Sequence, residues 1–412
     1  MVSKRSPANL PKGKGHVFEP DYPLQGSSLD VPLAMVLSMS PIQRTRYIRR
    51  LLIAFTKEIE AEQMALKAVV PFKKEMRELR SLVRSPADKF LYTDENTFKR
   101  NVLGKGSPGG SHTYWSRKQM WKMGTTKGDL PTLITEQSPQ LIATLEKLFD
   151  GTNKAKDQIR SKKKTAIQNA LTYMEWNAGV GTAFPPFHAK FLVDRFLPSE
   201  GDSIVFDPCV GWGGRMLGTL CVNRLSCVQY IGTDPEKRNK DAYEGIQRRV
   251  SIYLKDEIPG ERSAKIYYRP FEDWINTPAA NKLKGKVDLV MTSPPYFSAE
   301  NYNTSNKKQS ANRYTTYEQW REGFYSALVE GAFNLLKPGG VFVLNIANVK
   351  SAESLEKDAR IIARQYGFVN AGFYKLAMSV VPGSRGNIRH TVVVNGSTFK
   401  HEPVFCFRKP VK

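Results

Sequence analysis

Cysteine is scarce in this chain of 412 residues. Its four cysteines, Cys209, Cys221, Cys227 and Cys406, show no Cys-x-x-Cys spacing. Paired spacing of that kind is typical of zinc sites, and a denser set is typical of disulfide frameworks. The sequence therefore indicates neither, and we expect no metal. A reducing cytoplasm suits this composition.

Long apolar runs are also missing. The apolar segment 31–39 is interrupted by Pro32 and is too short to cross a bilayer. No signal peptide is recognisable around the basic, Pro- and Gly-rich residues 1–15. We therefore predict no membrane segment and a cytoplasmic location.

Acidic residues are in the minority. The chain has 39 Asp and Glu against 62 Lys and Arg, a formal net charge of +23. A basic excess of this size indicates an anionic partner, and nucleic acid is the commonest. A solvated basic surface is the alternative, although an aromatic content of 11% argues against a simple charged tail. The length allows two or three domains.

Residues 1–170 are expected to form a basic, mainly helical region. The sequence Ser-Pro-Ile-Gln at 40–43 is typical of a helix start with a capping box. Arg46, Arg49 and Arg50 follow in the first turns, where cations oppose the helix dipole. Bound phosphate and plain solvation explain these arginines equally well.

Aromatic and basic residues interleave at 114–122, where Trp115, Arg117 and Lys118 lie. Such interleaving suits stacking on bases together with contacts to the backbone of a nucleic acid. Core anchors of a small helical domain are the alternative. The preceding glycine-rich segment 104–110 lacks the Gly-Lys-Ser/Thr ending of a phosphate loop, so we predict no nucleotide site there.

From about residue 182, short apolar strands alternate with helices, which is typical of an α/β domain with a largely parallel sheet. A predicted strand at 203–206 leads into the glycine-containing run 207–215 and then a helix. This arrangement forms the binding half of a doubly wound sheet, in which glycine lets the backbone approach a cofactor. The next strand ends at Asp234, where a carboxylate can accept from ribose hydroxyls or cap a helix.

A further apolar strand runs into Ser293-Pro294-Pro295-Tyr296. The prolines stiffen the backbone and leave carbonyl groups free to accept hydrogen bonds. The Ser293 hydroxyl and the Pro294 carbonyl can together accept both hydrogens of an amino group, and the Tyr296 ring can stack on a base. Taken alone, these four residues are explained equally well by a proline turn that caps a core strand.

The Ser-Pro-Pro-Tyr sequence resembles the catalytic motif of the DNA amino-methyltransferases, which methylate exocyclic amines of bases with S-adenosylmethionine. The form with serine first resembles the cytosine-N4 branch more than the adenine-N6 branch. The run 207–213 resembles the family's Asp-Pro-Phe-x-Gly-x-Gly cofactor loop, with Cys209 in place of phenylalanine, and 401–409 resembles its final strand. The resemblance covers roughly residues 182–412.

This resemblance implies an α/β fold with a doubly wound, mostly parallel, seven-stranded Rossmann-like sheet over residues 171–412. It implies S-adenosylmethionine as the cofactor and double-stranded DNA as the partner, with catalysis by the motif Ser293, Pro294, Pro295 and Tyr296. The expected cofactor contacts follow the first three strands: Asp207, Pro208, Cys209, Gly211, Gly213, Asp234, Phe271, Glu272 and Asp273. The family's acid for the adenine amino group is replaced by Pro270, so Glu272 or Asp273 would serve.

Target recognition is assigned to residues 1–170, together with the polar segment 297–317, which we expect to be a lid over a flipped base. The loop 382–390 is a further candidate for DNA contact. The expected nucleic-acid contacts are basic or aromatic side chains: Arg46, Arg49, Arg50, Trp115, Arg117, Lys118, Lys307, Lys308, Arg313, Arg385 and Arg389.

Two other functions remain open: an RNA base methyltransferase, and a nucleic-acid-binding protein whose methyltransferase fold no longer turns over. Cys209 follows a proline, as does the nucleophile of cytosine-C5 methyltransferases, but its place in the cofactor loop favours packing. His188 and His390 are not needed as bases, because the expected mechanism does not require one. The implied setting is a bacterial or phage-infected cell, with restriction-modification as one role.

Overall fold

The structure of the protein is a computed structural model. It describes residues 24–61, 72–105, 108–123, 129–156, 160–178, 181, 183–298, 302–303, 305–380 and 390–411.

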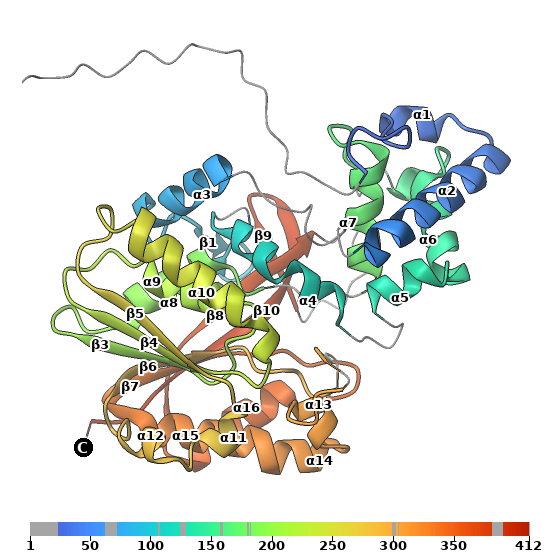
Figure 1. Ribbon diagram of the computed structural model, residues 1–412. Coiled ribbons are helices and arrows are strands. Elements are labelled where there is room, and N and C mark those ends of the chain that lie inside the picture. The colour runs from blue at the N-terminus through green and yellow to red at the C-terminus, as the bar shows by residue number, and fades with distance from the viewer. Residues whose placement is uncertain are drawn as a thin grey trace, which may run out of the picture.

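A mixed sheet forms the centre of the molecule, with ten strands among the described residues in the order β1-β2-β8-β10-β7-β6-β3-β4-β5, and with β9 paired to β10 (Figure 1). The doubly wound core comprises β3 (Ser203–Asp207), β4 (Val228–Thr233), β5 (Arg262–Tyr267), β6 (Val287–Thr292), β7 (Leu336–Asn345), β8 (Val369–Val380) and β10 (Ser397–Arg408). Within this core β10 runs antiparallel to both of its neighbours, β7 and β8. The predicted α/β class and Rossmann-like sheet are confirmed.

The prediction of seven strands is wrong for the whole sheet. β1 (Leu91–Asp94) and β2 (Lys99–Leu103) extend it beyond β8, and β9 (Thr391–Val394) pairs with β10. β2 begins with Lys-Arg-Asn, and only its last two residues are buried. Charged residues are usual near the edge of a sheet, where they discourage further pairing, so the sequence carries no clear strand pattern there.

Helices cover both faces of the sheet (Figure 1). On one face are α8 (Pro186–Phe196), α9 (Gly214–Leu220) and α10 (Lys240–Arg248), with a π-helix at Arg249–Tyr253. On the other are α11 (Phe271–Trp274), α12 (Pro278–Asn281), α13 (Ser310–Arg313), α14 (Tyr317–Trp320), a π-helix (Arg321–Ser326), α15 (Ala327–Leu335) and α16 (Leu355–Gln365). Each face has its own apolar core, which explains the nearly continuous apolar sequence of the central strands.

A separate helical cluster lies beside the sheet (Figure 1) and has its own buried core. It comprises α1 (Leu33–Leu37), α2 (Pro41–Glu60), α5 (Leu130–Thr135), α6 (Pro139–Phe149) and α7 (Ala166–Ala178). The predicted capping box is present at the start of α2: the Gln43 amide nitrogen lies 3.4 Å from Ser40 Oγ, and the Ser40 amide lies 2.9 Å from Gln43 Oε1.

Other N-terminal elements join or pack against the sheet instead: α3 (Phe72–Arg84), the strands β1 and β2, and a 3₁₀-helix (Gly110–Ser116). Helix α4 (Arg117–Trp121) contributes Trp121 to the core of the helical cluster. Short 3₁₀ turns lie at Lys154–Lys156 and Lys237–Asn239. Buried residues of α3 belong to the same apolar core as α8 and α9. The described elements before residue 170 are therefore divided between the helical cluster and the sheet.

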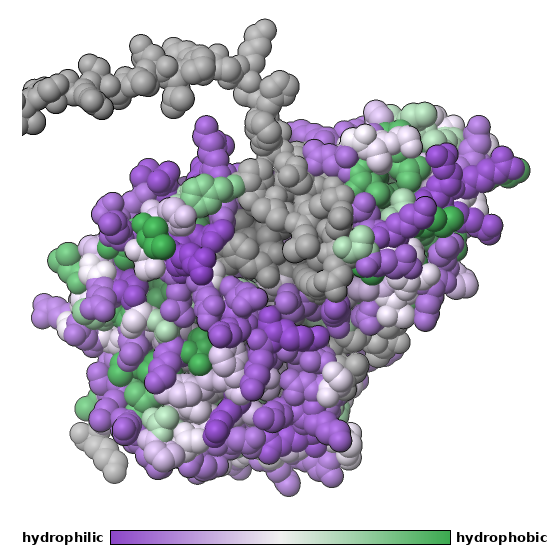
Figure 2. All heavy atoms as spheres, in the orientation of Figure 1, coloured by the Kyte–Doolittle hydropathy of each residue, from purple (hydrophilic) through white to green (hydrophobic). Residues whose placement is uncertain are grey.

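The surface in view is largely hydrophilic, with apolar side chains scattered over the helical cluster (Figure 2). Among the described residues, none of the helices combines the length and the hydrophobicity that a bilayer crossing requires.

Candidate active site

Strand β6 carries the Ser-Pro-Pro-Tyr motif to the middle of the sheet's carboxyl edge. All six residues of β6 are buried between β3 and β7. Ser293, directly after the strand, is partly exposed and lines two neighbouring cavities. Gly211, Trp212 and Tyr302 also line both. The motif therefore stands where the two cavities meet.

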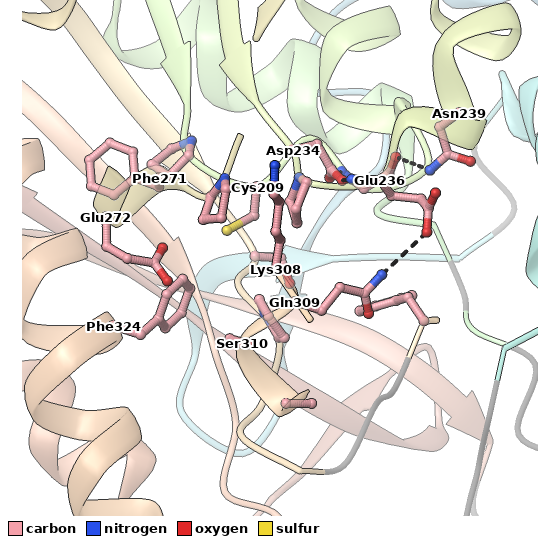
Figure 3. Close-up of a pocket in the computed structure, with 18 of the residues that line it drawn as sticks. Cys209, Asp234, Glu236, Asn239, Phe271, Glu272, Lys308, Gln309, Ser310 and Phe324 are labelled. Carbon is pink, nitrogen blue, oxygen red and sulfur yellow. Dashed lines mark hydrogen bonds between the residues drawn. The ribbon is translucent and has the colours of Figure 1, made fainter. Parts of the chain in front are cut away.

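The first cavity lies at the point where the strand order reverses, between β3 and β6, which is the usual ligand site of a doubly wound sheet. Figure 3 shows its walls, which come from the segments after β3, β4, β5 and β6. The residues include Pro208, Cys209, Asp234, Glu236, Asn239, Phe271, Glu272, Gln309, Ser310 and Phe324.

Asp234 follows β4 and is buried in the wall of the first cavity. One carboxylate oxygen accepts from the Gly211 amide at 2.8 Å and the other from the Glu236 amide at 2.8 Å. Burial raises the pKa of Asp234 to about 7, with the two backbone amides opposing that shift. The acid thus fixes the glycine loop and keeps acceptor capacity toward the cavity.

The structure distinguishes the two acids on α11. Glu272 lines the first cavity, and its Oε2 is buried without a partner among the described residues. Burial also raises the pKa of Glu272. Asp273 points to Arg313, 2.7 Å away, and its side chain is 44% exposed. Glu272 is therefore the acid available to a ligand in this cavity.

Asp207, which ends β3, lies behind the glycine loop and is fully buried. Its carboxylate accepts from Arg215 Nε at 2.8 Å, from the Tyr230 hydroxyl at 2.7 Å and from the Cys209 amide at 3.1 Å. Arg215 also donates to the Cys209 carbonyl. Asp207 was expected to touch a cofactor, but the structure places it among the groups that shape the loop.

The glycine loop contributes Gly211 to the cavity walls, together with Pro208 and Cys209. Gly213 packs against α10 instead: its φ is +82°, and a Cβ there would lie 2.6 Å from Ile246 Cδ1. Burial raises the pKa of the Cys209 thiol. Cys209 is half-buried in the cavity wall, and a raised thiol pKa disfavours the thiolate that a nucleophile needs, which agrees with a packing role.

The segment after the motif closes over the first cavity. Asn303 Nδ2 donates to Glu236 Oε2 at 2.9 Å on one rim. On the other rim, Arg313 donates to Glu272 Oε1 at 3.1 Å. Lys308 and Gln309 line the space between. The segment was expected to cover a flipped base; its described residues instead form a lid on the first cavity, and of them Tyr302 alone also lines the second.

The second cavity has a volume of about 690 Å³ and lies between the motif and the segments before α8. Tyr296 forms part of its wall, and its hydroxyl donates to Glu402 Oε2 at 3.1 Å. Asn345 lies beside them and donates to the Pro403 carbonyl at 3.0 Å. Burial raises the pKa of Glu402.

Two buried histidines hold the backbone at Gly104 and Gly109 near this cavity. His188 Nε2 lies 2.6 Å from the Gly104 carbonyl, and His112 Nδ1 lies 2.8 Å from the Gly109 carbonyl. A carbonyl only accepts, so these nitrogens carry the protons. Burial lowers the pKa of both histidines to about 4, so both are neutral at pH 7.

The comparisons with known proteins agree with this geometry. Residues 218–364 match the Eco57I restriction-modification methylase family. The match runs from α9 to α16 and includes Asp234 and the whole Ser-Pro-Pro-Tyr motif. It confirms that the chain is similar to methyltransferases, and it supports S-adenosylmethionine as the cofactor.

Solved structures of methyltransferases are also similar to parts of the chain. A SAM-dependent methyltransferase from Methanosarcina mazei shares 13% identity over 54% of this chain and 98% of its own, with a TM-score of 0.33. Magnesium protoporphyrin IX methyltransferase from Synechocystis shares 14% identity over 54% of this chain and 76% of its own, with a TM-score of 0.33. Scores this low carry no conclusion. No curated protein is similar enough in sequence to count as a match.

The first cavity fits the cofactor of a methylase. Asp234 suits ribose hydroxyls, the unpartnered Glu272 oxygen suits the adenine amino group, and the Phe271 ring lies beside them. A Cβ at Gly211 would have a single neighbour within 4 Å, its own loop's Cys209 carbonyl at 3.9 Å, so the loop leaves space on that side. No cluster of metal-binding side chains is found among the described residues.

The expected nucleic-acid contacts that the structure describes lie on α2 and on the lid. Arg46, Arg49 and Arg50 are exposed on α2. Lys307 is exposed on the lid. The backbone of Trp115, Arg117 and Lys118 lies in the 3₁₀-helix and α4, but their side chains are outside the description, as are Arg385 and Arg389 entirely. These contacts remain predictions.

The structure adds site residues that the sequence did not single out. Glu236 and Asn239 follow Asp234 closely in sequence, so their position just after the end of β4 could have marked them as candidate site residues. Glu402 stands within the final-strand motif but was not assigned a role. His112 and Gln309 come from distant polar segments, and no local pattern marks them.

Proposed function

We propose that this protein is a site-specific DNA methyltransferase. It transfers the methyl group of S-adenosylmethionine to an exocyclic amine of a base, with cytosine N4 favoured over adenine N6. The observation that carries the proposal is the position of Ser293 at the junction of two cavities. The first cavity suits the cofactor, and the second suits the base.

The chemistry needs little beyond positioning. The amine is a poor nucleophile, because its lone pair is delocalised into the ring. Hydrogen bonds from both N–H groups to Ser293 Oγ and the Pro294 carbonyl favour a pyramidal nitrogen with a localised lone pair. A bound S-adenosylmethionine would supply the methyl group: the nitrogen–carbon bond would form as its carbon–sulfur bond breaks, and the nitrogen would then release its proton to water. The alignment of the amine with the methyl group and the fixed dipoles of the site accelerate the transfer.

The base has to leave the duplex to reach Ser293. Buried side chains such as Phe184, Trp212 and Asn345 line the second cavity, and a base inside a duplex cannot enter such a space. Tyr296 is proposed to stack on the flipped base. Cytosine is placed ahead of adenine because the motif begins with serine. The match to a restriction-modification methylase family supports a cytoplasmic location.

Labelled S-adenosylmethionine with duplex DNA or RNA tests the proposal, with methylated nucleosides identified by mass spectrometry. We expect N4-methylcytosine from DNA, none from Ser293→Ala, and normal turnover from Ser263→Ala on the exposed side of β5. N6-methyladenine would keep the mechanism and change the base. Label in RNA alone would establish the RNA enzyme, and no label with cofactor binding intact would leave a binding protein.

Target recognition is proposed to involve the helical cluster through Arg46, Arg49 and Arg50. Removal of residues 1–170 would also remove α3, β1 and β2, which pack on the catalytic sheet. Replacement of the three arginines by alanine in the full chain is the cleaner test. Unchanged affinity and unchanged site preference would argue against this assignment.

A further inference from the structure

Helix α3 borders a shallow groove of about 540 Å³ that is unusually basic. Five of its eight lining residues are lysine or arginine and none is acidic: Lys73, Arg77, Arg80, Arg84 and Lys89, with Ser81, Ser85 and Pro86. The five cations are exposed. In Figure 2 the surface over α3 is mostly hydrophilic.

The basic residues form a stripe because of helical periodicity. Lys73, Arg77, Arg80 and Arg84 recur at steps of four, three and four residues, which places them on one face of α3. The opposite face is buried in the catalytic core through Met76, Leu79, Leu82 and Val83. The stripe is therefore held rigidly against the methyltransferase sheet.

Among the residues that the structure describes, one carboxylate pairs with the stripe. Glu257 accepts from Arg80 Nε at 2.8 Å and from Arg84 Nε at 2.9 Å, which orients both guanidinium groups. No carboxylate of the described residues lies in ion-pair contact with Lys73, Arg77 or Lys89. Five cations thus stand against one anion, a surplus that an anionic partner would neutralise.

The inner face of α3 also reaches the wall of the second cavity. A Cβ placed on Gly109 would lie 3.1 Å from Leu82 Cδ2 and 3.2 Å from Pro186 Cβ. Pro186 lines the second cavity, and so does Gly110. The stripe and the proposed base site thus lie on opposite sides of helix α3 and of the contact between Gly109 and Pro186.

We propose that the α3 stripe binds the sugar–phosphate backbone of duplex DNA beside the base in the second cavity. The inference rests on the proposed function. The eleven residue-to-residue steps from Lys73 to Arg84 span roughly 17 Å at 1.5 Å per residue, or about five nucleotide steps of 3.4 Å along one strand. Guanidinium and ammonium groups contact phosphates without reading sequence.

The test is the triple variant Lys73→Ala, Arg77→Ala and Lys89→Ala, which leaves the Glu257 pairs in place. Its affinity for a duplex is measured against salt concentration, with and without the methylation site. Because each lost phosphate contact removes about 0.9 from the slope of log affinity against log salt, we expect a slope smaller by about 2 to 3. Target and non-target DNA should weaken alike.

The matched control replaces Lys282, Lys284 and Lys286 by alanine. These lysines are also exposed, but they precede β6 at the amino edge of the sheet, so the control should leave the slope unchanged. A triple variant with the control's slope would overturn the proposal. So would weakening confined to the target sequence, or a slope change with RNA duplexes alone.

Two further measurements keep the outcome clear. Binding of S-adenosylmethionine and the turnover rate at saturating DNA should stay unchanged, because the stripe touches neither cavity wall. If the triple variant fails to fold, the single change Arg77→Gln should still reduce the slope by about 0.9. Failure of the wild-type protein to methylate DNA would reject the proposed function separately, before any variant is compared.

Discussion

The hydroxyl of Tyr296 and the carboxylate of Glu402 form a hydrogen bond of 3.1 Å. Tyr296 ends the motif after β6, and Glu402 lies on β10, two strands away in the sheet. Both residues line the second cavity. A buried tyrosine hydroxyl usually requires such a partner, and the contact fixes the ring that is proposed to stack on the base.

Loss of this contact should slow the reaction without loss of the ring. In Tyr296→Phe the carboxylate loses a donor, and unmade buried hydrogen bonds cost about 1–3 kcal/mol. We expect kcat/KM for DNA to fall about tenfold. If Glu402 acts only through Tyr296, the double variant with Glu402→Gln should be no slower than the slower of the two single variants. Fully additive losses would instead mean that Glu402 contacts the base itself.

Cofactor binding should strengthen with rising pH because of Asp234. Burial raises the pKa of Asp234 to about 7, and its ionised form is the better acceptor for ribose hydroxyls. Affinity for S-adenosylmethionine should therefore rise between pH 6 and 8, by at most about tenfold per unit below pH 7. Calorimetric titration checks this. In Asp234→Asn the affinity should be lower and the rise should be absent; an unchanged rise would assign the titration to another group.

The two acids of α11 provide a matched pair. Glu272→Gln should weaken cofactor binding about tenfold, because charged hydrogen bonds contribute about 1.5–3 kcal/mol. Asp273→Asn should have little effect, since that side chain faces Arg313 at the surface. Both variants lose a contact with Arg313 on the lid, so lid opening alone would affect them equally. Equal losses would therefore contradict a direct role for Glu272.

Local signals made much of the fold predictable. The capping residues of α2, the glycine loop after β3 and the apolar strand before Ser293 each depend on neighbours in sequence. Their structures follow from backbone rules that short segments already obey. These segments place the site at the carboxyl edge of the sheet, and the first cavity lies there.

The rest of the site could not be predicted, because it depends on contacts between residues that are far apart in sequence. Tyr296 and Glu402 are 106 residues apart in sequence, so no local pattern pairs them. The choice between Glu272 and Asp273 depends on the orientation of a single helical turn. Asp207 ends β3, where a binding acid would stand, but Arg215 and Tyr230 occupy its oxygens. Sequence spacing gives the position of a carboxylate but not the partners that tertiary packing supplies.

The Asp207–Arg215 pair should affect stability more than its surface counterpart does. Its side chains are 0% and 5% exposed, with 2.8 Å between Arg215 Nε and Asp207 Oδ2. In Asp207→Asn the guanidinium becomes a buried charge without a counter-ion, which costs about 3–5 kcal/mol.

The pair Asp88–Arg100 has a similar distance, 2.9 Å, but exposures of 54% and 59%. Asp88→Asn should cost at most about 1 kcal/mol. Urea unfolding at pH 7 measures both free energies, and equal values would show that burial does not strengthen this pair. Because Asp207 also shapes the glycine loop, its variant should bind S-adenosylmethionine more weakly even though Asp207 does not line the cavity, whereas Asp88→Asn should bind it normally.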